Sequence, residues 1–169
     1  NGDVTVPAPH PHHAISQHNG PPSPGVYVLL GDQVQLAANQ LVSFLSLPRG
    51  KLRGIAKGAK RSKKRFGGLL SPFLLVDVDC FENPNRDLVR IEGCGLIHYY
   101  ALIYGDLEKL LVGCCALEFL ERVLPERGEQ EDWFELLRSC LDYLNRKGET
   151  GPLLWVFFAF TFHPHRETH

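Results

Sequence analysis

Residues 49–81 read RGKLRGIAKGAKRSKKRFGGLLSPFLLVDVDCF, and this stretch decides the fold because strand-like patterns flank a strongly basic loop. The first pattern lies in residues 50–58, where small or apolar side chains alternate with Lys51, Arg53 and Lys57. Alternation with a period of two predicts a β-strand, since successive side chains of a strand point to opposite faces. We therefore predict a strand that carries three cations on its exposed side.

A second strand-like pattern follows the Gly-bounded loop predicted at residues 59–68; this loop and the two residues before it, 57–68 in all, are called the basic loop below. In residues 74–80, Asp77 and Asp79 alternate with apolar side chains, which predicts a strand with its acids in solvent. Three further strands are predicted from short apolar runs bounded by turn-forming residues: 26–30, 40–46 and 88–97. Five short strands within about 75 residues are typical of a small closed barrel, so we predict an OB-fold over residues 26–104.

After Gly105 the spacing of apolar residues changes to a helical period, which predicts two amphipathic helices. Asp106 is placed to cap the first helix, which should end before Pro125. The predicted buried face of the first helix consists of Leu107, Leu110, Leu111, Cys114, Leu117 and Leu124. The second helix should stop at Gly148 and bury Phe134, Leu137, Cys140, Leu141 and Leu144. The predicted fold class is α+β: an N-terminal small β-barrel followed by a truncated, partial helical domain over residues 105–169.

Residues 1–25 are rich in proline and histidine and contain six of the chain's twelve prolines. Such a composition cannot bury a core, so we expect a disordered leader. Its histidines could in principle hold zinc or nickel: His10, His12, His13 and His18. Nothing in the sequence fixes their geometry, and we therefore expect no metal site and no cofactor.

Positive charge is concentrated in the quoted stretch, where residues 49–68 hold nine of the eighteen Lys and Arg residues and no carboxylate. Like charges at this density repel, so a folded protein tolerates them chiefly where a polyanion neutralises them. Phe66 ends the charged run, and an aromatic ring beside cations is the arrangement that single-stranded nucleic acid binders use. The predicted nucleic-acid-binding surface consists of Arg49, Lys51, Arg53, Lys57, Lys60, Arg61, Lys63, Lys64, Arg65 and Phe66.

The basic segment has other interpretations: a solvated loop, a nuclear-import-like signal, a site for an acidic protein, or contact with an anionic membrane. Three of the cations lie in the strand predicted within residues 50–58 and so belong to the fold, which is evidence against a pure targeting signal. If about six cations meet phosphates, log K should fall with log salt at a slope near −4 on single strands. We expect little sequence preference, because no pair of side chains suited to reading base edges is evident.

Motifs for catalysis are absent from the sequence, which lacks GxxxxGK[ST], GxGxxG, GxSxG and HExxH; we predict no catalytic residue and no enzyme. Asp77 and Asp79 could form part of a metal site, but a solvated strand face is the favoured interpretation. The five cysteines form no CxxC pair, so we expect reduced, buried thiols in a cytosolic protein. The longest apolar run near the end, residues 153–162, is too short to span a membrane, and we expect no membrane partner.

The run RGKLRGIAKGAKRSKKRFGGLLSPFLLVDVD, followed by YGDLEKLLVGCCALEFLERVLPE and WFELLRSCLDYL, resembles the bacterial RecO family of recombination mediators over residues 41–144. The most specific element is G-K-x-x-G-x-A-K-G-A-K-R-S-K-x-R-F. The resemblance implies an OB-fold followed by a helical domain, in a protein of RecF-pathway DNA repair that is not an enzyme. It further implies binding of single- and double-stranded DNA, strand annealing, contact with the acidic C-terminal tail of SSB, and RecA loading with RecR. The location implied is the cytoplasm, at the nucleoid.

Some parts of the chain depart from the family pattern. Residues 31–46 read GDQVQLAANQLVSFLS where the family usually has a stretch of the G-E-x-D-R kind, and residues 153–169 match the family poorly. The chain also contains no Met and begins at Asn1. We therefore expect a sequence that is truncated or frameshifted at both ends. Two other functions stay open: a basic OB-fold RNA-binding module, and an interaction scaffold that grips an acidic peptide.

Overall fold

The computed structural model describes residues 25–36, 38–47, 49–83, 85–146 and 150. The predictions about the proline- and histidine-rich leader, its four histidines, Gly148 and the apolar run 153–162 lie outside these residues.

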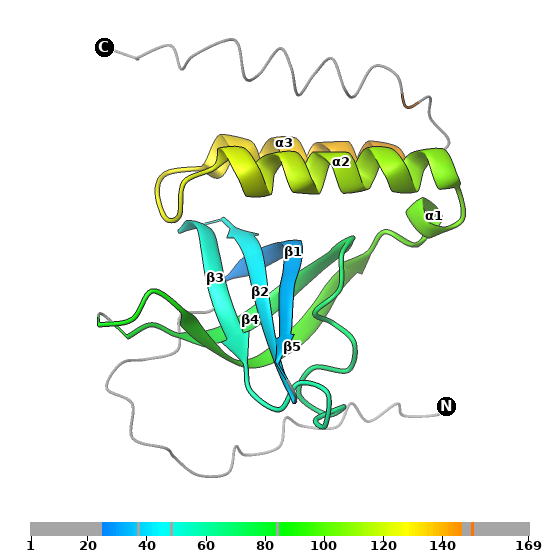
Figure 1. Ribbon diagram of the computed structural model, residues 1–169. Coiled ribbons are helices and arrows are strands. Elements are labelled where there is room, and N and C mark those ends of the chain that lie inside the picture. Colours follow the sequence, from blue (N-terminus) through cyan, green and yellow to red (C-terminus); the bar gives the residue numbers. More distant parts are fainter. Residues whose placement is uncertain (1–24, 37, 48, 84, 147–149, 151–169) are drawn as a thin grey trace, which may run out of the picture.

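Five strands form a closed barrel, as the sequence predicts (Figure 1). They are β1 (Val26–Leu36), β2 (Asn39–Ser46), β3 (Gly50–Ala56), β4 (Leu74–Phe81) and β5 (Val89–Tyr99). The order around the barrel is β1-β2-β3-β5-β4, and only the pairing of β3 with β5 is parallel among these described strands. The barrel confirms the predicted OB-fold architecture.

Strand β1 is longer than the apolar run at 26–30 that predicts it. Its pairing with β2 shifts register between Leu29 and Gly31 and then continues to Leu36 opposite Asn39. A β-bulge of this kind lets a strand continue after its side-chain alternation has been interrupted. Strand β4 follows its prediction, since Asp77 and Asp79 are exposed and the residues that alternate with them, Val76, Val78 and Cys80, are buried.

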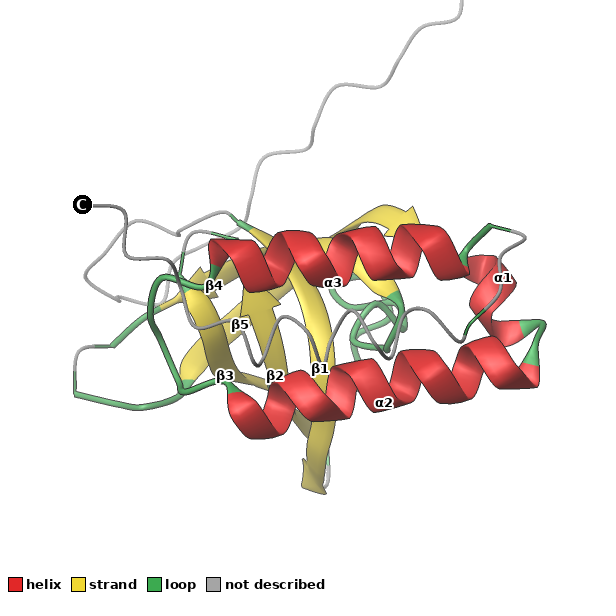
Figure 2. Cartoon of the chain, turned by 90° about the horizontal axis from the view of Figure 1, so that it is seen from above, coloured by secondary structure: helices red, strands yellow, loops and turns green. Residues whose placement is uncertain are grey.

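The strands have apolar side chains on both faces because helices cover part of the barrel's outer surface (Figures 1 and 2). One cluster fills the barrel and includes Tyr27, Phe44 and Val76. A second cluster lies outside the barrel, where Val28 and Leu45 pack with residues of the helices. Burial on both faces fixes the strand register strongly, since a shift by one residue would exchange the two clusters.

Three helices follow the barrel: α1 (Ala101–Tyr104), α2 (Leu107–Val123) and α3 (Glu131–Leu144). The Asp106 carboxylate accepts hydrogen bonds from the backbone N–H groups of Glu108 and Lys109, which confirms the predicted cap of α2. The buried face of α3 is also confirmed in full: Phe134, Leu137, Cys140, Leu141 and Leu144. Figure 2 shows α2 and α3 side by side over the barrel.

The predicted buried face of α2 is wrong in part. Leu107 and Leu111 are 71% and 57% exposed, and Cys114 is exposed as well, whereas Gly113 and Ala116 are buried. The reason is close packing: a Cβ added to Gly113 would lie 2.7 Å from the ring of Phe73. The helix therefore turns its small residues towards the barrel, a choice that hydrophobic periodicity alone cannot predict.

No helix of the described residues is long and apolar enough to cross a membrane.

Candidate nucleic-acid interface

The basic loop is a folded turn that backbone hydrogen bonds hold at both ends. Its backbone forms helix-like bonds, with the N–H of Ser62 donating to the carbonyl of Gly58 and that of Phe66 donating to the carbonyl of Ser62. Gly58 adopts a φ of +67°, a left-handed conformation that glycine adopts without steric cost. The Arg65 carbonyl accepts from the Cys94 N–H of β5 at 3.1 Å. The charges of the loop are therefore carried on a fixed backbone.

Six side chains of the basic loop reach solvent, and we call them the exposed cations: Lys57, Lys60, Arg61, Lys63, Lys64 and Arg65. None of the six forms an ion pair with a carboxylate of the described residues. Arg65 donates instead to the Ser62 hydroxyl and the Lys57 carbonyl. A dense group of cations without acidic neighbours creates a positive potential, which attracts anions.

Arg49 lies among protein groups and is not an open phosphate contact. Its guanidinium pairs with Glu82, donates to the Tyr27 hydroxyl at 2.5 Å and to the Cys80 Sγ at 3.1 Å. Burial, followed by the bond with Cys80, raises the pKa of Tyr27 well above its usual value, so the phenol stays neutral. The assignment of Arg49 to the exposed surface is corrected: this side chain joins β1, β4 and the residues that precede β3.

Lys51 is buried, with only 7% of the residue exposed, which corrects the prediction of three exposed cations on this strand. Its ammonium donates to the backbone carbonyls of Glu121 and Leu124 and lies 3.7 Å from the Glu121 carboxylate. These carbonyls end helix α2, where a positive charge is favoured by the helix dipole. The backbone of Lys51 also accepts from the Arg127 N–H at 2.8 Å. Lys51 therefore fastens the barrel to the end of α2.

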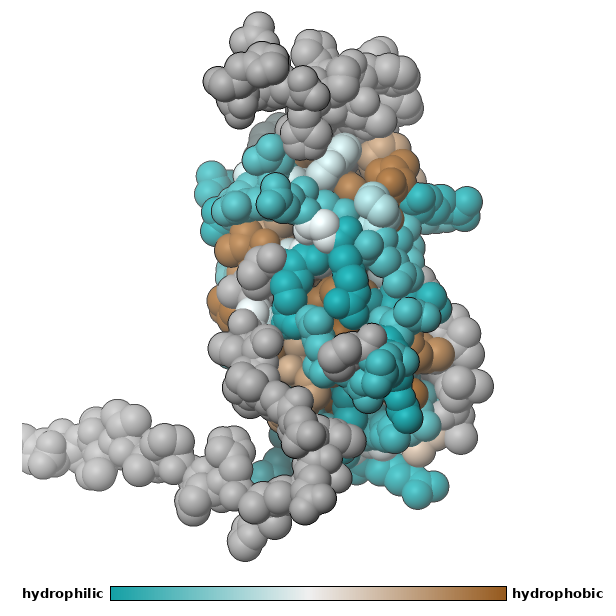
Figure 3. Space-filling view, turned by 90° about the vertical axis from the view of Figure 1, so that its left-hand side faces the viewer, coloured by the Kyte–Doolittle hydropathy of each residue, from teal (hydrophilic) through white to brown (hydrophobic). Residues whose placement is uncertain are grey.

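Arg53 is partly exposed and pairs with Glu126 at 3.4 Å. This side of the molecule, where β3 and the α2–α3 loop lie, faces the viewer in Figure 3 and is largely hydrophilic. Arg127 forms a second surface pair, with Glu82 at 3.1 Å. Exposed pairs of this kind stabilise a protein by no more than about 1 kcal/mol and are screened by salt, so Arg53 can exchange its partner for another anion.

Phe66 is buried inside the barrel and is 2% exposed, so its ring cannot stack on a base from solvent. The prediction of a stacking role is corrected, because the ring packs in the barrel's cluster while the guanidinium of Arg65 lies 5.1 Å from its centre. The phenylalanine anchors the basic loop to the core. In any sequence, an aromatic residue beside cations can either stack on a base or anchor its loop in the core, and only the three-dimensional packing decides between these two roles.

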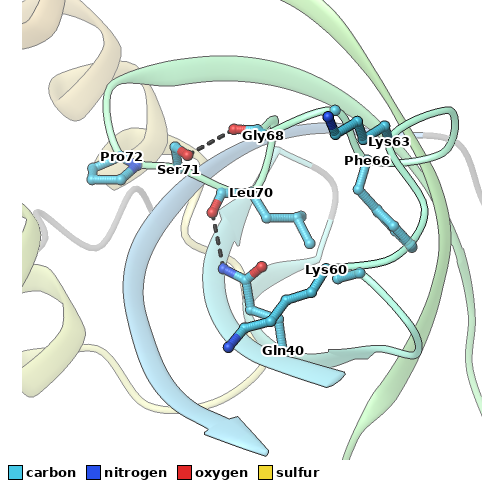
Figure 4. Close-up of a pocket in the computed structure, with 10 residues that line it drawn as sticks. Gln40, Lys60, Lys63, Phe66, Gly68, Leu70, Ser71 and Pro72 are labelled. Carbon is cyan, nitrogen blue, oxygen red and sulfur yellow. Dashed lines mark hydrogen bonds between the residues drawn. The ribbon is translucent and has the colours of Figure 1, made fainter. Parts of the chain in front are cut away.

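Between the basic loop and the start of β2 lies a hollow of about 400 Å³ (Figure 4). Lys60, Lys63 and Phe66 of the predicted site line it, together with seven residues outside that site: Gln40, Ala59, Gly67, Gly68, Leu70, Ser71 and Pro72. Barrel closure brings these segments together, and no local pattern in the sequence marks them.

The cysteines divide into two groups, which corrects the prediction that all are buried. Cys80 and Cys140 are buried and Cys94 is half-buried, but Cys114 and Cys115 are exposed on α2. Burial raises the pKa of the Cys140 thiol to about 11; burial and then the charges of Asp79 and Asp77 raise that of Cys94 to about 12. Within the described part of the chain, no group of three or more His, Cys, Asp or Glu side chains is placed to hold a metal ion.

A closed five-stranded barrel with an exposed cationic loop and a helical unit behind it defines the class of basic OB-fold proteins. Two family models match: recombination protein O N terminal over residues 33–100 and recombination protein O C terminal over residues 104–162. The chain belongs to the recombination protein O (RecO) family. The second match corrects the expectation that residues 153–162 lie outside the family pattern.

Several curated relatives are named DNA repair protein RecO. The protein of Geobacter sulfurreducens is 32% identical over 121 residues, which are 72% of this chain and 49% of the relative. The protein of Geobacter metallireducens is 34% identical over 125 residues, 74% of this chain and 50% of the relative. The protein of Syntrophobacter fumaroxidans is 32% identical over 132 residues, 77% of this chain and 52% of the relative. The chain spans about half the length of the curated relatives it matches.

Proposed function

We propose that this chain acts in DNA repair as a DNA-binding recombination mediator, and that it binds single- and double-stranded DNA through the exposed cations. The observation that carries the proposal is the basic loop, which holds six solvent-exposed cations on a folded backbone. The relatives named DNA repair protein RecO support the same role. Arg53 extends this surface along β3, while Arg49, Lys51 and Phe66 belong to the fold.

Phosphate contacts govern such binding, because each cation that meets a phosphate releases a counterion. About six contacts on a single strand give a slope of log K against log salt near −4, which is roughly a 250-fold loss of affinity between 50 and 200 mM salt. Fluorescence anisotropy with a labelled oligothymidine measures this slope directly. A salt-independent affinity would contradict the proposal, and so would structured RNA displacing the DNA completely at equal nucleotide concentration.

Strand annealing follows from the same charges, because a cationic surface lowers the repulsion between two complementary strands. We further propose that the chain binds the acidic C-terminal tail of SSB and cooperates with RecR in RecA loading, at the nucleoid in the cytoplasm and without catalysis of its own. Annealing of two labelled strands, followed by energy transfer, tests the first point. Pull-down of purified SSB, with and without its acidic tail, and of purified RecR tests the second.

A further inference from the structure

The hollow beside the basic loop has an apolar floor and a charged rim (Figure 4). Leu70 and Phe66 line the floor and are 8% and 2% exposed, so the floor offers apolar contact but not the open stacking platform that the sequence predicts for Phe66. Lys60 lies beside Gln40 on one side of the hollow, and Lys63 lies on the opposite side, towards Gly68. Both lysines are exposed, so an anionic chain could contact both ammonium groups while it passes over the opening.

Hydrogen bonds hold the walls of the hollow in place. The side-chain amide of Gln40 donates to the carbonyl of Leu70 at 3.0 Å, which joins the first residues of β2 to the end of the basic loop. The hydroxyl of Ser71 donates to the carbonyl of Gly68 at 2.7 Å. A volume of about 400 Å³ falls within the range of sites that enclose small organic ligands. The hollow is therefore a fixed part of the fold, and its lining combines apolar, amide and cationic groups.

These groups match the chemistry of one nucleotide. A nucleobase has flat apolar faces, which suit the apolar floor of the hollow. The phosphates before and after that nucleotide carry the negative charges that two ammonium groups on opposite rims would neutralise. A base inside a duplex is stacked and paired, so it can enter a pocket only after it has been extruded at a cost of a few kcal/mol.

We propose that this hollow receives one unpaired base of a single-stranded nucleic acid, with the two neighbouring phosphates held by Lys60 and Lys63. The inference rests on the proposed function and deepens it, because it assigns part of the binding to a base and not only to phosphates. It also gives the basic loop a preference for single strands over duplexes, since a duplex presents the same charges but no free base.

The test compares two single strands that carry the same number of phosphates. One is an oligothymidine, and the other has the same length with abasic sites through its central part. The full chain should bind the oligothymidine about tenfold more tightly, because contacts to one base typically contribute a factor of this size. The variant Ala59→Phe, which adds a ring in the lining of the hollow, should remove this preference, so that the oligothymidine binds no more tightly than the abasic strand. Ser139→Phe, on the exposed side of α3, is the matched control and should keep the preference.

The outcomes separate the inference from the proposed function. If neither strand binds at low salt, the proposed function fails and the inference fails with it. If both strands bind equally well, the hollow takes no base although phosphate binding stands. A preference that survives in folded Ala59→Phe places the base contact elsewhere and also overturns the inference. A second measurement uses the wild-type protein alone and follows the fluorescence of a single 2-aminopurine placed in the strand. Its emission should change on binding, because the base leaves its stacked neighbours. An unchanged emission would contradict the insertion of a base.

Discussion

The basic segment, residues 49–68, has two halves: residues 49–56 before the turn and the basic loop, 57–68. Both contain lysines and arginines, but these side chains lie in opposite surroundings. Before the turn, Arg49 and Lys51 lie against carboxylates, carbonyls and a phenol of the protein itself. In the basic loop, Lys60 and Lys63 are exposed and face no carboxylate within ion-pair distance among the described residues. The first half joins the barrel to its neighbours, and the second half presents charge to solvent. Charge density in a sequence therefore does not by itself define a binding surface.

The difference arises from what covers each segment. Strand β3 runs beside the end of α2 and the α2–α3 loop, so a lysine there meets helix carbonyls that lack partners within the helix. The basic loop lies at the other end of β3, where no helix of the described residues covers it (Figure 1). Four predictions test or refine this contrast, and they follow in order of decreasing effect.

Removal of charge from the basic loop should have the largest effect: it should lower the affinity for DNA and leave the stability of the fold nearly unchanged. The quadruple variant Lys60→Ala, Arg61→Ala, Lys63→Ala and Lys64→Ala should weaken single-stranded DNA binding by about two to three orders of magnitude at 0.1 M salt. Arg65 is kept because it donates to Ser62 and to the Lys57 carbonyl and so supports the loop. Anisotropy titration measures the affinity, and thermal unfolding should be nearly unchanged.

A matched control removes the same number of charges elsewhere: Arg86→Ala, Arg122→Ala, Arg138→Ala and Arg146→Ala. All four arginines are exposed in the described residues. This control should retain most of the wild-type affinity. Equal losses in the two quadruple variants would mean that net charge, and not the basic loop, governs the binding.

Substitution of Lys51 should mainly lower the free energy of unfolding. Lys51→Met keeps an apolar stem but leaves the Glu121 and Leu124 carbonyls and the Glu121 carboxylate without their cation, which should cost about 2 kcal/mol. Lys60→Met, at an exposed position, should stay within about 0.5 kcal/mol of wild type. Urea unfolding measures both values. If the two substitutions cost the same, Lys51 does not fasten α2 as described.

The buried thiol of Cys140 should make the free energy of unfolding depend on pH. Burial raises the pKa of the Cys140 thiol from its ordinary value near 9 in the unfolded chain to about 11 in the folded one, so the folded protein holds this proton more tightly. The stability that this provides is complete below about pH 9 and is lost as pH rises towards 11; the loss should reach about 1 kcal/mol at pH 9.5. Unfolding titrations at pH 7 and 9.5 should show a smaller difference for Cys140→Ala than for wild type, and an equal difference would contradict the assignment.

Arg53 lies between the two halves and should show the smallest effect on stability. Its pair with Glu126 is about two-fifths exposed on both sides, so Arg53→Ala should change the free energy of unfolding by less than about 0.5 kcal/mol. The same variant should reduce the salt slope of DNA binding by about 0.7 if Arg53 exchanges Glu126 for a phosphate. An unchanged slope would limit the DNA surface to the basic loop.

Local patterns predicted much of the fold. The alternation around Asp77 and Asp79, the cap at Asp106 and the apolar face of α3 depend on neighbours in sequence, and all three are confirmed. The site was harder to predict, because the burial of Lys51 and Phe66 depends on segments that are distant in sequence. The prediction of the buried face of α2 was wrong in part for a similar reason, since Gly113, which permits close packing against Phe73, adds nothing to the hydrophobic pattern. Partners across the fold, and not residue type, decide which cations remain exposed.

The most direct test of this account is the salt dependence of single-stranded DNA binding, measured for wild type and the two quadruple variants. The account predicts a slope near −4 for wild type and for the control, and a slope near −1 for the loop variant, because four contacts of about 0.7 each are lost. A loop variant that kept the wild-type slope would contradict the claim that the exposed cations of the basic loop hold the DNA.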